Sequence, residues 1–131
     1  ASSARRGELV VREFSQGGAL QLVLCWGCHP DCLHQLEAFE EMLDWVHTYF
    51  VHARESGWPV QLLAPQADGS WSRSEQAEIL AGAGLWATPA PPPWNDVEGW
   101  ARLDFWLGPY PGREVRAFEF GEQARPERRL A

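Results

Sequence analysis

The sequence predicts one α/β domain in which a mixed β-sheet is flanked by helices. Three observations lead to this fold class. The chain has 131 residues, which is the length of a single domain with a substantial core. Strand-like apolar runs alternate with a helical pattern of apolar residues. The first strand–helix–strand unit predicts a parallel pair of strands joined by a right-handed crossover.

An N-terminal β-hairpin is expected first, after a short polar tail at residues 1–7. Glu8–Phe14 (ELVVREF) has the composition of a strand, and Ser15–Gly18 provides a tight turn. Ala19–Trp26 (ALQLVLCW) is almost continuously apolar, which is typical of a central strand that is covered on both faces. These two strands would lie next to each other at the start of the domain.

A long helix is predicted over Asp31–Glu55. Its apolar residues recur at steps of three and four, so they share one buried face. Asp31 can cap the start of this helix, and Gly57 and Pro59 end it. The apolar face comprises Leu36, Phe39, Leu43, Val46 and Phe50. The acidic residues that lie off this face are Glu37, Glu40, Glu41 and Asp44.

Shorter elements follow the long helix. Pro59–Ala64 is predicted to be a buried strand. The spacing of Ser72–Glu75 is that of a capping box, so a second helix is expected from there to about Ala83. Ala87–Trp94 must be an extended loop, because its prolines exclude a regular helix or a central strand.

The chain closes with a predicted antiparallel hairpin, Leu103–Leu107 and Val115–Phe120, around a Pro-Gly turn. Residues 122–131 are polar and charged and are expected to form a flexible tail, which leaves residues 8–121 as the folded domain. The expected order is therefore ββαβαββ. The alternative is an α+β sandwich with an unrelated topology.

The charge of the chain suits a basic protein partner. Net charge is −7, and all 11 basic residues are arginine. Residues 1–7 carry +2 and residues 122–131 carry +1, so residues 8–121 carry −10. Such an acidic body disfavours nucleic acid and anionic membranes as partners. We also expect no membrane insertion, because no apolar run approaches the roughly 18–20 residues that a spanning helix needs.

The three cysteines lie within eight residues, at the predicted junction between a strand and the long helix. A helix N-terminus lowers the pKa of a nearby thiol, so Cys28 is the candidate attacking thiol and Cys32 the resolving one. Cys25 lies within the apolar strand and is expected in the core. Two alternatives remain: three inert buried thiols, or a zinc site in which His34 is a fourth ligand. We assign no cofactor or metal, because zinc sites usually draw their ligands from two separate segments.

This order of elements, with cysteines at the first strand–helix junction, resembles the thioredoxin-like superfamily and especially its peroxiredoxin-like and copper-chaperone branches. The likeness is carried by the N-terminal hairpin ELVVREFSQGGALQLVLCW, the segment CHPDC and the closing hairpin LDFWLGPYPGREVRAFEFG. The spacing of Cys28 and Cys32 is similar to that of copper-chaperone members. The resemblance covers roughly residues 8–121, and it implies a thioredoxin-like fold and a thiol–disulfide redox protein that uses Cys28 and Cys32.

A non-catalytic function is the alternative: an acidic protein-binding module, of the inhibitor or immunity type, that recognises a basic partner. The acidic side of the long helix would supply the charge. The chain also has eight tryptophans, and tryptophans in loops are favoured anchors of protein interfaces. Those expected in or beside loops are Trp58, Trp71, Trp86, Trp94 and Trp100.

Overall fold

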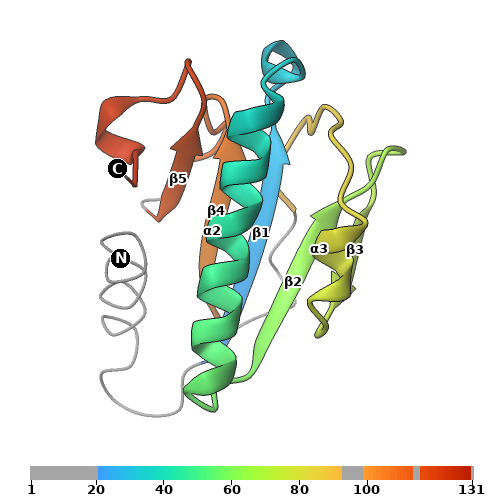
Figure 1. Ribbon diagram of the computed structural model, residues 1–131, viewed down its shortest axis with the longest axis vertical. Coiled ribbons are helices and arrows are strands. Elements are labelled where there is room, and N and C mark those ends of the chain that lie inside the picture. Colours follow the sequence, from blue (N-terminus) through green and yellow to red (C-terminus); the bar gives the residue numbers. More distant parts are fainter. Residues whose placement is uncertain (1–20, 93–98, 114–115, 131) are drawn as a thin grey trace.

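Five strands form one sheet in the order β3-β2-β1-β4-β5 (Figure 1). The central strand β1, Leu22–Cys28, is parallel to β2, Val60–Pro65, on one side and to β4, Ala101–Leu107, on the other. β3, Trp71–Ser74, is antiparallel to β2, and β5, Ala117–Phe120, is parallel to β4. The predicted α/β class with a mixed sheet in one domain is therefore confirmed.

This computed structural model describes residues 21–92, 99–113 and 116–130. The predicted first strand, Glu8–Phe14, lies outside these ranges and stays a prediction. In the part of the chain that is described, every peptide bond is trans. Within the same ranges, no helix combines the length and the apolar character that a membrane crossing requires.

β1 is buried along its whole length because its seven residues are apolar or small and both of its neighbours are parallel strands. Gly27 shows how closely the strand is packed. A Cβ atom at this position would come within 2.5 Å of the Trp106 ring, so only glycine leaves room for the indole on the sheet. The observed strand starts and ends later than the predicted Ala19–Trp26.

The helix α2, Leu36–Glu55, lies across one face of the sheet (Figure 1). Four residues of the predicted apolar face are buried there: Phe39, Leu43, Val46 and Phe50. Leu36 is the exception, because its side chain is 63% exposed at the first residue of the helix. The helix also starts later than predicted. Asp31 belongs instead to a short 3-10 helix, η1, Pro30–Cys32, which begins after the capping residue His29.

The predicted second helix is wrong at its start. Trp71–Ser74 forms strand β3, which pairs with β2 across the turn at Asp68 and Gly69. The strand forms because the turn places this segment opposite the exposed edge of β2. A single helical turn, α3, Glu78–Ala81, follows. Its apolar side chains contact the same hydrophobic cluster as α2, so the two helices cover one face of the sheet.

The predicted antiparallel closing hairpin is also wrong, because β4 and β5 are parallel. Their C-terminal ends are adjacent, and Gly108 N donates to Phe120 O at 2.8 Å. The connection does not turn straight back because Tyr110 anchors it to the sheet. The Tyr110 ring packs edge-on against Trp106, with 5.1 Å between ring centroids, and its backbone N–H donates to Glu119 at 2.9 Å.

Residues 122–130, which the sequence suggests to be a flexible tail, carry the short helix η2, Pro126–Arg128, and bury Ala124 and Leu130. Arg125 fastens this segment by forming an ion pair with Glu119, a carboxylate that is only 1% exposed. Burial tends to raise the pKa of Glu119. The hydrogen bonds from Arg125 and from two backbone N–H groups outweigh that effect and hold the pKa below its usual value.

Replacement of Glu119 by glutamine tests how much the Glu119–Arg125 ion pair stabilises the fold. A carboxyl whose pKa is lowered in the folded state stabilises the fold above the unfolded value, and this contribution is lost as the pH falls through the folded value. We therefore expect Glu119→Gln to cost on the order of 3 kcal/mol at neutral pH, and we expect the gap to wild type to shrink as the pH falls below the usual glutamate pKa. Urea unfolding of both proteins over this pH range measures this. Parallel pH profiles would contradict the assignment.

Candidate functional site

The carboxyl ends of β1, β4 and β5 meet at one edge of the sheet, to which their arrowheads point in Figure 1. Backbone hydrogen bonds join them: His29 N donates to Leu107 O, and Gly108 N donates to Phe120 O, both at 2.8 Å. β1 connects through α2 to β2 on one side, whereas β4 lies on its other side. Such a switch point in strand order is where open α/β sheets bind ligands.

Cys28, the last residue of β1, lies at this edge but is only 2% exposed. Its backbone is held from both sides by Thr88, whose hydroxyl accepts from Cys28 N at 3.1 Å and whose N–H donates to Cys28 O at 2.8 Å. The thiol donates to the His29 carbonyl at 3.2 Å. Burial raises the pKa of the Cys28 thiol to about 12, with the charge of an ionised Cys32 as the second cause.

Cys32 lies in η1 and is fully buried. Its thiol packs onto Gly108, where a Cβ atom would come within 2.6 Å of the sulfur, and it donates to Gln123 Oε1 at 3.4 Å. Burial raises the pKa of this thiol, and the nearby carboxylates of Asp31 and Glu122 add to the effect. The dipole expected to lower the pKa is displaced, because α2 begins only at Leu36.

Cys25 is buried in the core, as the sequence suggests, and its thiol donates to Asp104 Oδ1 at 2.6 Å. Burial, followed by the charge of Asp104, raises the pKa of Cys25 well above its usual value. This side chain belongs to the cluster on the opposite face of the sheet from Cys28 and Cys32. The four-ligand zinc site with His34 is therefore not formed. Among all described residues, no three such side chains gather in a metal-binding arrangement.

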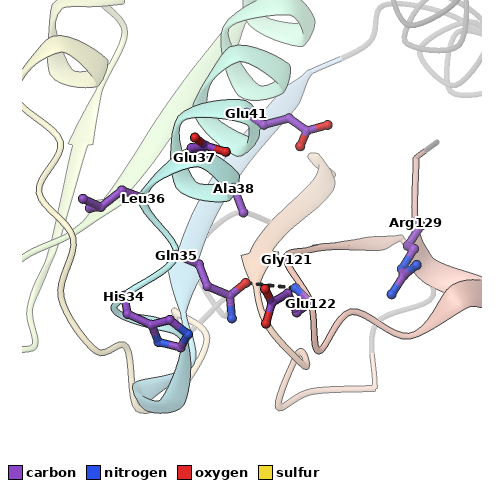
Figure 2. Close-up of a pocket in the computed structure, with 9 residues that line it drawn as sticks. All are labelled: His34, Gln35, Leu36, Glu37, Ala38, Glu41, Gly121, Glu122 and Arg129. Atoms are coloured by element: carbon purple, nitrogen blue, oxygen red, sulfur yellow. Dashed lines mark hydrogen bonds between the residues drawn. The ribbon is translucent and has the colours of Figure 1, made fainter.

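A groove of about 790 Å³ opens between the start of α2 and the segment after β5 (Figure 2). The first turns of α2 form one wall, with Leu36, Glu37 and Glu41. The segment after β5 forms the other wall, with Glu122 and Arg129. Figure 2 shows the carboxylates of Glu37 and Glu41 on the helical side and Arg129 across from them. The groove therefore presents carboxylates from two walls, the guanidinium of Arg129 and one exposed aliphatic side chain.

Gln35 fixes the two walls to each other. It is 9% exposed, its Oε1 accepts from Glu122 N at 2.9 Å, and its Nε2 donates to Gln123 Oε1. Gly121 makes this contact feasible, because a Cβ atom there would overlap the Gln35 oxygen and because its φ of 91° suits glycine. The thiol of Cys32 donates to the same Gln123 oxygen, so it helps to hold Gln123 in place against Gln35.

The groove carries charge and apolar surface together. Leu33 and Leu36, 40% and 63% exposed, are the large exposed hydrophobic residues in the described ranges, and Leu36 lines the groove. The wall residue Arg129 is already engaged, since its Nε and Nη2 donate to Ala124 O at 3.1 and 2.9 Å. Two further exposed carboxylates, Glu40 and Asp44, continue the acidic side of α2 beyond the groove residues Glu37 and Glu41.

The sequence predicts the acidic helix but not the opposite wall of the groove, which the segment after β5 forms. No local pattern links Gln35 to Glu122, which lies 87 positions away. The tryptophans expected as anchors do not line this groove. The described ones, Trp58, Trp71, Trp86 and Trp100, are half-buried. Trp94 lies outside the described residues.

The thiols are expected to be inert in the native protein. All three are free and buried, and their raised pKa values keep them protonated near neutral pH. Their reaction with an aromatic disulfide reagent should accelerate by about two orders of magnitude when the protein is unfolded in urea. One or two thiols that react in the native state at the rate of free cysteine would contradict this. Cys32→Ser would identify which thiol is responsible.

Gly121→Ala tests whether the position of the Gln35 side chain requires glycine at residue 121. We expect it to lower the free energy of unfolding by about 2–3 kcal/mol, because both the positive φ and the overlap with Gln35 oppose a side chain. Gly69→Ala is the matched control, since its φ of 88° is similar but no atom lies within 4 Å of the new Cβ. Equal losses in urea unfolding would show that Gln35 imposes no constraint.

Comparison with known proteins gives no relative. No family model, no curated protein and no solved structure matches this chain. The thioredoxin-like relationship therefore stays a prediction from the sequence, and the function is inferred from the site itself.

Proposed function

We propose that this protein is a non-catalytic binding module that recognises a basic protein segment through the groove beside α2. One observation carries the proposal. The groove is lined by carboxylates on both walls, with Glu37 and Glu41 on the helix and Glu122 opposite, and the exposed Leu36 lines it at the start of the helix. A surface that combines aliphatic contact with negative charge is complementary to a segment with both basic and apolar residues.

The apolar part would supply binding energy. Leu36 is the first residue of α2, beyond the part of the helix that packs on the sheet, so nothing in the fold requires a leucine there. Complete burial of such a side chain contributes about 1.5–3 kcal/mol.

The charged part would supply specificity and speed. Glu37 and Glu41 lie one helical turn apart on α2, and like charges at this spacing destabilise a helix slightly when nothing neutralises them. A bound cation removes this repulsion. Complementary charge also steers association and makes it sensitive to salt. The acidic chain, with a sequence pI near 5.0, favours such an encounter with a basic protein.

The thiol–disulfide function expected from the sequence gains no support from this geometry. An attacking thiol must be accessible and ionised. Cys28 and Cys32 are 2% and 0% exposed, and burial raises both pKa values. The groove is the accessible feature at the same edge, which is why we prefer a binding function.

Selection of displayed random peptides on the immobilised full chain tests the proposal. We expect the recovered sequences to be enriched in arginine or lysine next to aliphatic residues, with binding that weakens as salt rises. A double variant, Glu37→Gln and Glu41→Gln, should lose most of this enrichment. The control is Glu55→Gln with Glu78→Gln, which removes the same charge from exposed positions away from the groove. The proposed function would be refuted if the selected peptides lacked basic residues, or if both double variants lost the enrichment equally.

A further inference from the structure

We infer that the partner enters this groove as a short extended segment whose arginine binds the carboxylates of the two walls. The inference rests on the proposed function and specifies its partner. Three features carry it: a second groove that extends the first, the placement of the carboxylates, and the rigidity of the walls.

The groove continues along α2. A second hollow of about 390 Å³ shares Glu41, Gly121 and Arg129 with the first, and the buried side chains of Trp45 and Leu130 lie at its far end. Glu37, Glu41 and Trp45 follow one another at intervals of four residues, so they form a single stripe of the helix. Two such intervals measure about 12 Å along the axis. This is the length of about four residues of extended chain.

Arginine fits the charges better than lysine does. Glu37 and Glu41 lie on the helical wall, whereas Glu122 lies on the wall that follows β5 (Figure 2). A guanidinium group has five donors in a planar fork and can bind carboxylates on two sides. An ammonium group is a compact point charge that stays strongly hydrated.

The walls are already in place before a partner arrives. Gln35 binds the backbone of Glu122, and the guanidinium of Arg129 binds Ala124 O. The buried Glu119–Arg125 pair holds the same segment to β5. A preformed site loses little conformational freedom on binding, which lets a short segment bind measurably.

A second copy of this chain is a poorer occupant. Residues 8–121 carry a net charge of −10, so two acidic bodies repel each other on approach. A basic segment of another protein has the complementary charge.

The test uses a capped hexapeptide of alternating leucine and arginine, titrated into the isotopically labelled full chain at about 0.15 M salt. The matched probe replaces each arginine by citrulline, which keeps the shape and removes the charge. A third peptide carries lysine instead. We expect the arginine peptide to bind at least about 10-fold more tightly than the citrulline peptide and several-fold more tightly than the lysine peptide. Backbone amide signals of residues 33–45 and 121–130 should move.

Protein variants locate the binding. Glu41 lines both hollows, so Glu41→Gln should lower the affinity for the arginine peptide by about 5–10-fold. Glu78→Gln, an exposed charge on α3, should change it by less than about two-fold. Equal binding of the arginine and citrulline peptides, or signal changes outside the groove, would overturn the inference.

The two proposals fail in different ways. Displayed peptides that are basic and depend on Glu37 and Glu41, combined with equal binding of the arginine and lysine hexapeptides, would leave the proposed function standing and remove the inferred arginine contact. Selection that yields no basic peptides removes the function itself. Concentration-dependent self-association in sedimentation velocity, abolished by Glu41→Gln, would identify a second copy as the occupant and overturn the inference.

Discussion

The rest of the structure depends on the complete burial of β1. Its residues pack on both faces, with Leu22, Leu24, Trp26 and Cys28 under α2 and Val23 and Cys25 on the other side. A strand buried in this way needs a hydrogen-bonded neighbour on each side, and the parallel strands β2 and β4 provide these. Because β5 is also parallel to β4, the four strands β1, β2, β4 and β5 end at the same edge, and the segments that form the groove leave from there.

Two buried carboxylates hold the side of the sheet that lacks α2. Asp104 accepts hydrogen bonds from Cys25, Arg102 and the Tyr110 hydroxyl. Glu119 accepts from the Tyr110 backbone and pairs with Arg125. Tyr110 therefore links both carboxylates, and through them it fixes the connection after β4 and the segment after β5. The second wall of the groove depends on these polar contacts because few apolar residues lie in that segment.

Local patterns in the sequence predict the parts of the fold that depend on local spacing. The apolar run that becomes β1 and the helical repeat that becomes α2 are both visible in the sequence. Leu36 fits the repeat but is exposed, since the repeat contains no information on where the sheet ends. The Pro-Gly segment after β4 predicts a hairpin, yet the Tyr110–Glu119 and Glu119–Arg125 contacts determine the path of the chain. Pairings such as Gln35 with Glu122 depend on the tertiary fold.

The same backbone geometry explains why Cys28 and Cys32 lie at the carboxyl edge of the sheet and yet are buried. Cys28 ends a buried strand, so its side chain points into the core that α2 covers. Cys32 lies in a three-residue 3-10 turn, and the positive end of the α2 dipole is reached only after Leu33–Gln35. The residues that do emerge at that end are leucines and glutamates. The fold therefore exposes leucine and glutamate side chains at this edge, and the buried thiol of Cys32 donates to Gln123 in the segment that forms the other wall of the groove.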